Sequence, residues 1–355
     1  MSRRSSLVVL VATSLVSTAG LGACGNADSG RSDADDAGDA GTSDESETSA
    51  ESTATGTATD TGDGDGDGST GDGDGDGDGD GSSGCGTPAP DASGGVNVML
   101  DAGAEGDGLR RFYLSRPADY NPTKPYKLIV GYAGTNWVGD MIAPYLGLES
   151  DAVQAADDEI FVYPDPLWRD FDGWGNLGGW LLGPYAVPAD GNQDLVFTEA
   201  VLDYMESNYC IDRERIFATG HSWGGDMAQV VSCFMGDRFR ASVPVAANRP
   251  YWFEDGSNSV DCVGETAVWT MFGQNDTHFN SQTQGLECRD FWLEARGCDG
   301  VDAFTSLNLG DAEDECVEFD GCQVRTRFCL YAAQWGHQIP GDYFASATME
   351  WFRSF

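Results

Sequence analysis

The sequence predicts an α/β fold with a largely parallel sheet that helices cover on both faces. Short, continuous apolar runs recur after residue 85, as is typical of buried parallel strands. Segments with helical periodicity lie between these runs, and alternating strands and helices indicate βαβ units. Residues 85–355 have ordinary apolar content and a length that one core can support. We therefore expect one folded domain over residues 85–355.

The first 24 residues have the pattern of an export signal. Arg3 and Arg4 precede an apolar stretch that is too short and too rich in small residues for a membrane span. Its end, LGAC, resembles the lipobox of bacterial lipoproteins, in which the cysteine, here Cys24, is lipidated and becomes the N-terminus. An ordinary signal peptide is the alternative. The sequence thus predicts an extracytoplasmic bacterial lipoprotein, on the cell surface or outer membrane, that touches membrane only through its lipid.

Residues 25–84 predict a disordered acidic tether. They are almost entirely Asp, Gly, Ser, Thr, Ala and Glu, so they have no apolar face to offset the entropy cost of ordering. Of the net charge of −40, this segment contributes −17 and the two N-terminal arginines +2, so the part from Cys85 onward carries −25. Such a charge repels nucleic acid and anionic lipid, and neutral or weakly charged substrates are expected.

The apolar runs define the elements of the folded part. Central strands are expected at residues 126–132, 159–163, 215–219, 241–246 and 267–272, and a late strand at 324–331. The clearest helix spans 192–209, where apolar residues recur near one face. A closing helix is expected at 342–355.

One strand-to-helix junction carries a candidate nucleophile. Ser222 lies between Gly220 and Gly224 in IFATGHSWGGDMA, which fits the pattern G-x-S-x-G. In that pattern a strand turns sharply into a helix and exposes the serine oxygen, and only residues with little or no side chain fit beside so tight a turn. A serine that is merely structural is the alternative.

A reactive serine needs a histidine base and an acid that orients it. In this class of sheet the chain order is nucleophile, acid, histidine, and the last two follow later strands. Asp276 and His337 satisfy that order. His278 would need an acid upstream or a crossed arrangement. His221, inside the turn, is expected to have a local packing role.

The oxyanion formed during acyl transfer needs two backbone amides. We expect these from Trp223, which follows the serine, and from Thr135, in the loop after the early strand. Trp137, Trp174 and Trp180, together with Trp168, fall in expected loops. They are candidates to contact a phenolic acyl group or a sugar face, and packing of a long loop is the alternative.

The cysteines indicate disulfides rather than a metal site. There are ten, none in a C-x-x-C pair, and the histidine spacing does not suggest zinc. If Cys24 is lipidated, nine remain, so at least one is free or pairs outside the chain; the sequence leaves the connectivity open. We expect no metal, no organic cofactor, no nucleic-acid partner and a monomer.

Four segments in this order resemble a known family: RRFYLSRPADYNPTKPYKLIVGYAG, NQDLVFTEAVLDYMESNYCIDRERIFATGHSWGG, FGQNDTHF and WGHQIPG. They are similar to α/β-hydrolase esterases that include feruloyl esterases and polyhydroxybutyrate depolymerase-like enzymes. The resemblance implies an α/β-hydrolase fold over residues 85–355 and a triad of Ser222, Asp276 and His337. Family members commonly show His-Gly in the early loop, where this chain has Ala133 and Gly134.

The resemblance implies a serine esterase that works through an acyl-enzyme. The expected substrates are hydroxycinnamoyl esters of plant polysaccharide, as small molecules or on the polymer. An acetyl xylan esterase and a short-chain hydroxyalkanoate esterase are alternatives. So is a surface binding lipoprotein that has lost activity, which the unusual early loop motivates.

Overall fold

The computed structural model describes residues 81–150, 158–171, 173–182, 192–250, 262–278, 281–309 and 312–355. All lie in the second of two units into which the chain divides, Asp72–Phe355. The predicted export signal, Cys24 and the tether up to residue 80 lie outside the described residues. Packing begins shortly before the predicted boundary at Cys85, since the amide of Ser82 donates to Ile211 O (2.9 Å) and its hydroxyl to Tyr209 O (2.6 Å).

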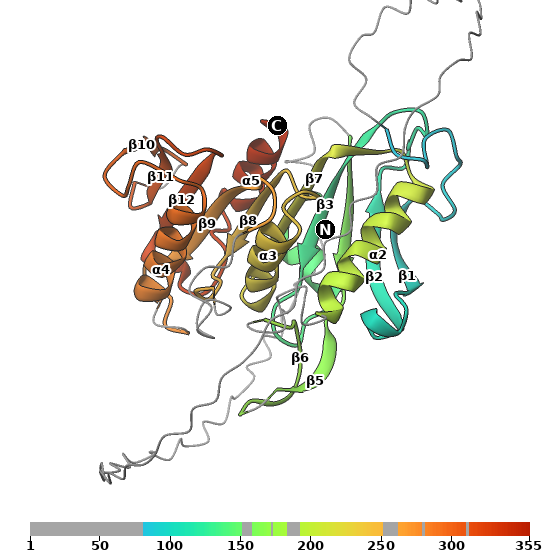
Figure 1. Ribbon diagram of the computed structural model, residues 1–355, viewed down its shortest axis with the longest axis horizontal. Helices are drawn as coiled ribbons and strands as arrows, with labels where there is room; N and C mark the ends of the chain where they lie inside the picture. Colours follow the sequence, from blue (N-terminus) through green and yellow to red (C-terminus); the bar gives the residue numbers. More distant parts are fainter. Residues whose placement is uncertain are drawn as a thin grey trace, which may run out of the picture. The chain divides into compact units, whose positions relative to one another are not determined.

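One ten-stranded sheet forms the centre of this unit (Figure 1), with the strand order β1-β2-β4-β3-β7-β8-β9-β12-β11-β10. The strands are β1 (Gly94–Asp101), β2 (Leu109–Arg116), β3 (Tyr126–Tyr132), β4 (Glu159–Pro164), β7 (Ile211–His221), β8 (Ala241–Val245), β9 (Ala267–Gly273), β10 (Phe304–Leu307), β11 (Glu315–Phe319) and β12 (Thr326–Tyr331). The six strands from β4 to β12 in this order are parallel, and antiparallel strands extend both edges. The six predicted strands form the parallel part.

Helices cover both faces of the sheet, as predicted. One face carries α2 (Gln193–Asn208), α3 (Trp223–Phe234) and α4 (Ser281–Ala295), and the other α1 (Gly139–Leu146) and α5 (Phe344–Arg353). Strand β3 shows why its sequence is continuously apolar. Leu128 and Val130 belong to the core beside α2 and α3, and Ile129 to the core beside α1 and α5. Side chains alternate across a strand, so a strand between two helical layers needs apolar residues at every position.

Several strands were absent from the sequence prediction because they are only half buried. In β1 and β2 exposed and less exposed positions alternate, so neither reads as a continuous apolar run. The segment with three of the candidate tryptophans is not simply a loop. It forms a separate hairpin of β5 (Leu167–Phe171) and β6 (Gly175–Gly179), and Trp168 lies on β5.

Four disulfides stabilise the described part of the chain. They join Cys85 to Cys210, Cys233 to Cys262, Cys298 to Cys322 and Cys316 to Cys329. Cys288 is buried and outside these pairs, which agrees with the odd number expected. The first disulfide holds the start of the domain against the end of α2.

Among the described helices, none combines the length and apolar character that a bilayer crossing requires.

Candidate active site

The turn between β7 and α3 places Ser222 in a strained backbone conformation. Its φ is 58° and its ψ is −125°, in a region that residues with a side chain rarely adopt. The flanking glycines are required by space. A Cβ at Gly220 would lie 2.2 Å from Gly224 O, and one at Gly224 would lie 2.1 Å from Tyr132 O. The Ser222 amide donates to Val245 O (2.9 Å), so β8 also holds the turn. These are the features of a nucleophile elbow.

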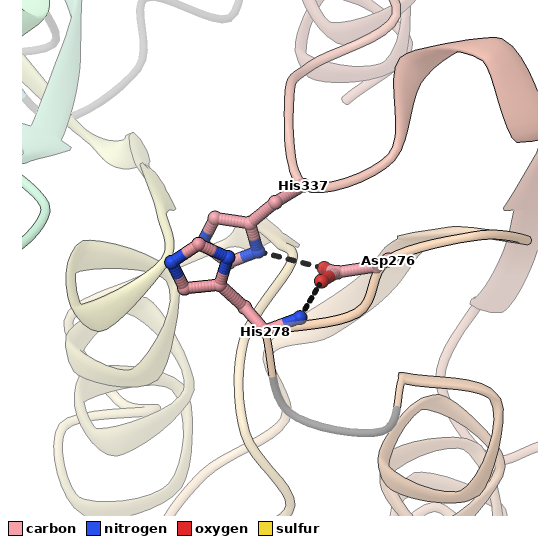
Figure 2. A group of neighbouring side chains, drawn as sticks. All are labelled: Asp276, His278 and His337. Carbon is pink, nitrogen blue, oxygen red and sulfur yellow. Dashed lines mark hydrogen bonds and ion pairs between the residues drawn. The ribbon is translucent and has the colours of Figure 1, made fainter. Parts of the chain in front are cut away.

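Three residues distant in sequence form one hydrogen-bonded chain at the ends of the parallel strands. His337, which follows β12 and the short 3-10 helix Ala333–Trp335, has Nε2 3.0 Å from Ser222 Oγ. Its Nδ1 lies 2.7 Å from Oδ2 of Asp276, which follows β9 (Figure 2). The structure therefore brings together the serine, the acid and the histidine that the sequence singles out.

The ionisation of Asp276 sets the direction of these hydrogen bonds. Burial alone would raise its pKa, but hydrogen bonds from the His337 ring and the His278 amide lower the pKa below its ordinary value. Asp276 is thus a carboxylate at neutral pH, and a carboxylate only accepts hydrogen bonds. His337 therefore carries its proton on Nδ1, and its Nε2 is an acceptor for the Ser222 hydroxyl. An imidazole in this tautomer is arranged as a general base.

The two other histidines surround His337 and do not replace it. Burial lowers the pKa of His221 to about 4, so it is neutral at pH 7. Its Nε2–H donates to the backbone carbonyl of His337, so it supports the loop that presents His337 as well as packing locally. The His278 ring stacks on the His337 ring, with centroids 4.4 Å apart and an interplanar angle of 13°. His278 also donates its amide to Asp276 Oδ1 (2.9 Å).

Asp276, His278 and His337 also have donor atoms within 4.8 Å of one another, close enough to consider a shared metal ion (Figure 2). Their orientation does not fit one. A metal binds an imidazole in the plane of the ring, and two nearly parallel stacked rings cannot direct their lone pairs at one point. Both nitrogens of His337 already contact Ser222 and Asp276.

Two backbone amides stand beside the serine without an acceptor among the described residues. Trp223 is the first residue of α3, where an amide has no intrahelical partner. Thr135 lies in the exposed loop after β3. A Cβ built on its neighbour Gly134 would lie 3.5 Å from Ser222 Cβ and 3.0 Å from His221 O. This close approach places the loop against the serine, where its amide can serve an oxyanion.

Hairpin β5–β6 holds the loop that carries Thr135. Asn136 donates its amide to Gly178 O (2.8 Å) and accepts from Gly178 N (2.9 Å) through Oδ1. Trp180, just after β6, donates its indole N–H to Ala133 O (2.8 Å). Its carbonyl accepts from Trp223 Nε1 (2.9 Å). The hairpin and the residue that follows it therefore contact Trp223 and the neighbours of Thr135 in the loop after β3.

The candidate substrate-binding tryptophans have different environments. Trp180 is 0% exposed and packs edge-to-face on Tyr132, so it cannot contact a substrate and that prediction is wrong. Its physical role is to support the loop before Thr135. Trp137 packs on Tyr145, which in turn contacts His221. Trp174 lies at the tip of the hairpin and is 71% exposed.

We expect replacement of Asn136 to slow catalysis by displacing the loop. Its φ of 63° is tolerated by Asn and Gly but strains Ala. Asn136→Ala removes one hydrogen bond and adds strain, whereas Asn136→Gly removes only the hydrogen bond. Complete loss of one oxyanion donor lowers kcat by about 10²- to 10³-fold. A donor that is only displaced should cost less, so we expect kcat to fall by about tenfold in Asn136→Ala and by a smaller factor in Asn136→Gly. Initial rates with p-nitrophenyl acetate test this, and equal rates for all three proteins would contradict it.

A buried polar cluster lies under the first turns of α3. Burial raises the pKa of Asp226 to about 7. Two hydrogen bonds from Asn248 act in the opposite direction, but their effect on the pKa is smaller than that of burial. Asn248 O accepts from Gln229 Nε2 (2.9 Å) and from the thiol of Cys288 (3.0 Å). Gln229 Oε1 in turn accepts from the indole of Trp292 (3.0 Å). The cluster connects α3 to α4 and to the segment after β8.

This pKa predicts a dependence of stability on pH. A carboxyl group with a pKa of about 7 when folded and about 4 when unfolded takes up a proton on folding between these values. It therefore stabilises the fold at low pH, and this stabilisation is lost as the pH rises through 7. Relative to Asp226→Asn, the wild type should lose up to about 1.4 kcal/mol of unfolding free energy per pH unit between about pH 4 and 7. Urea unfolding across this range measures it, and a constant difference would contradict it.

The fold and the elbow define a class, that of α/β-hydrolases with a serine at the reacting centre. Comparisons with known proteins agree. The model of the prolyl oligopeptidase family matches residues 191–278. Among solved structures, the acetyl xylan esterase from Aspergillus awamori is 18% identical with a TM-score of 0.55, over 73% of this chain and 99% of that one. At this identity the similarity concerns the fold alone.

Sequence relatives then identify the family. The probable feruloyl esterase C of Aspergillus niger is 34% identical over 269 residues, 73% of this chain and 89% of the relative. That of Aspergillus terreus is 28% identical over 253 residues, 69% of this chain and 82% of the relative. The chain belongs to the feruloyl esterase-like α/β-hydrolases, and it is a serine carboxylic ester hydrolase.

Proposed function

We propose that this enzyme hydrolyses hydroxycinnamoyl esters of plant cell-wall polysaccharide, with Ser222 as nucleophile, His337 as base and Asp276 as orienting acid. The observation that carries the assignment is the hydrogen-bonded chain of these three side chains at the elbow of a member of this family. The amides of Thr135 and Trp223 are assigned to the oxyanion hole.

In the acylation half, Ser222 Oγ forms a bond to the ester carbonyl carbon while its proton moves to His337 Nε2. The carbonyl π electrons move to oxygen, and the two amides bind the resulting oxyanion. The imidazolium is stabilised by the Asp276 carboxylate, 2.7 Å from Nδ1. Collapse of the tetrahedral intermediate breaks the bond to the alcohol oxygen, and His337 gives that oxygen its proton. The products of this half are the free alcohol and the acyl-enzyme.

Deacylation repeats these steps with water. His337 takes a proton from water as the water oxygen attacks the acyl carbon, and the same amides bind the second oxyanion. When the bond to Ser222 breaks, the proton on His337 returns to Oγ. A carboxylic acid leaves and the enzyme is restored. These steps need no group beyond the side chains, the amides and water.

The substrate class rests on the relatives, whose names specify feruloyl esters, and on the tryptophans of hairpin β5–β6 and of the loop after β3. Trp137 and Trp174 are proposed to contact the substrate. The acidic domain favours neutral esters, which suits hydroxycinnamoyl groups on a neutral polysaccharide.

We also propose that the enzyme is exported as a monomer and anchored by lipid on Cys24, with residues 25–84 as its tether. The disulfides support an oxidising compartment.

A substrate panel tests the proposed class. Feruloylated arabinoxylan, acetylated xylan and poly(3-hydroxybutyrate) are offered to the purified enzyme and to Ser222→Ala, and the released acids are quantified. We expect the wild type to release ferulate and Ser222→Ala to release none. Release of acetate without ferulate would assign an acetyl xylan esterase, and release of hydroxybutyrate alone a hydroxyalkanoate esterase. Equal release by both proteins would refute the serine assignment.

The anchor is tested separately. In bacterial cells that express the full chain, mass spectrometry of the mature N-terminus should find lipid on Cys24, and Cys24→Ser should move the enzyme from the membrane to the soluble fraction. A soluble wild-type enzyme would refute the anchor without affecting the catalytic assignment.

A further inference from the structure

The two faces of hairpin β5–β6 have different surroundings. Residues that face each other on paired strands share a side, so Trp168 and Gly178 lie on one side with Asp170 and Asn176. The opposite side contacts the domain, where Arg169 binds Asp194 (2.9 Å) and the Phe171 ring lies tilted against Trp223 (ring centroids 4.6 Å apart, interplanar angle 55°). On the side with Trp168, the side chains of Trp168, Asp170 and Asn176 are exposed to solvent, whereas Gly178 is buried beside the loop that carries Asn136.

This solvent side has the chemistry of a sugar-binding surface. Trp168 is 58% exposed, although an indole of this size is usually buried. Asp170 and Asn176 lie next along the two strands, both exposed, with a 3.2 Å hydrogen bond from Asn176 Nδ2 to Asp170 Oδ1. Their other lone pairs and the second amide hydrogen can bind hydroxyl groups. A flat ring beside a carboxylate and an amide matches a pyranose, which has an apolar C–H face and a rim of hydroxyls.

The indole also lies beside the loop after β3. A Cβ at Gly178 would be 3.3 Å from Trp168 Cε2 and 3.4 Å from the Asn136 Cα. Asn136 is the neighbour of Thr135, whose amide is assigned to the oxyanion hole. A ligand on the indole would thus adjoin the loop that binds the ester oxygen.

Exposure and charge favour sugar over the phenolic ring. A hydroxycinnamoyl ring gains most from an enclosed apolar slot, whereas this surface is open to water. A sugar keeps part of its hydration when bound, so an open surface suits it. Asp170 would repel an anionic sugar, so a neutral chain is favoured.

We propose that the solvent side of hairpin β5–β6 is a subsite for a neutral pyranose chain, with Trp168 as its stacking platform and Asp170 and Asn176 as its hydroxyl contacts. It holds the polysaccharide part of the ester beside Ser222. This inference rests on the proposed function in that the ester must be carried by a polysaccharide.

The experiment compares substrates with and without a sugar chain. The kcat/KM for a feruloylated xylo-oligosaccharide is divided by that for methyl ferulate, in the wild type, Trp168→Ala, Asn176→Ala and Phe304→Ala. The last variant is the control, because Phe304 is an exposed ring on β10 at the far edge of the main sheet. An aromatic contact contributes about two- to tenfold in affinity, so the ratio should fall by that factor in Trp168→Ala, fall less in Asn176→Ala and stay constant in the control.

Other outcomes overturn the inference. An unchanged ratio in Trp168→Ala, with methyl ferulate turnover reduced equally, would mean that the indole binds the phenolic ring or only supports the Asn136 loop. If the wild type does not cleave feruloyl esters, the proposed substrate class fails, and the subsite is tested directly by tryptophan fluorescence titration with unesterified xylohexaose. Saturable binding that Trp168→Ala weakens would support the subsite, and no binding or equal binding would refute it.

Discussion

Ser222→Ala should lower kcat for p-nitrophenyl acetate by at least about 10⁴-fold. Removal of a serine nucleophile from a triad costs up to about 10⁶-fold, and the oxyanion amides alone leave some residual rate. The variant keeps Cβ and loses only Oγ, which contacts His337 Nε2 at 3.0 Å, so the fold should persist. A fluorophosphonate probe should label the wild type at Ser222 and leave the variant unlabelled.

Ser232→Ala is the matched control. Ser232 lies on the same helix, α3, and its buried hydroxyl donates to Ala228 O (2.6 Å) away from the site. This variant should keep both the label and the turnover. A Ser222→Ala enzyme with more than a tenth of the wild-type rate would show that another group is the nucleophile.

Asp276→Asn should lower kcat by about 10⁴-fold while the structure is retained. An amide at this position can donate to Nδ1 of His337, which would place the ring proton on Nε2 and leave no acceptor for the serine hydroxyl. The variant also loses the charge that stabilises the imidazolium. Steady-state rates with saturating p-nitrophenyl acetate measure the change, and a thermal unfolding curve shows whether the fold persists.

Asp212→Asn controls for the removal of a buried carboxylate. Asp212 is 4% exposed and pairs with Arg215 near the start of β7, whereas Ser222 follows the end of that strand. The kcat of this control should stay within about twofold of the wild-type value, because the removed charge lies about 30 Å along the strand from the serine. A loss in Asp276→Asn no larger than in the control would remove Asp276 from the mechanism.

The central part of the fold could be predicted because its sequence signals are local and redundant. A strand such as β3, buried on both faces, must be apolar at every position, and the elbow needs Gly220 and Gly224 because backbone atoms lie about 2 Å from where a Cβ would be. The convergence of Ser222, Asp276 and His337 followed from chain order, since parallel strands end at one edge of a sheet.

What the sequence did not reveal depends on contacts between distant segments. An exposed Trp174 and a fully buried Trp180 look alike in a loop rich in glycine and aromatics. Only the packing of Trp180 on Tyr132, and its hydrogen bond to Ala133 O, separates a structural residue from a surface one. The pairing of eight cysteines and the contact of His221 with the His337 carbonyl likewise join segments that no local pattern connects.

The backbone of Ser222 implies that this chain is not the most stable sequence for its own fold. A side chain at φ 58° and ψ −125° costs about 1–3 kcal/mol, and glycine would avoid most of that cost. Ser222→Gly should therefore be inactive yet melt at a higher temperature than the active enzyme. Directed evolution that selects on thermal tolerance alone would drift toward dead variants at this position, so any such screen must score turnover in the same step.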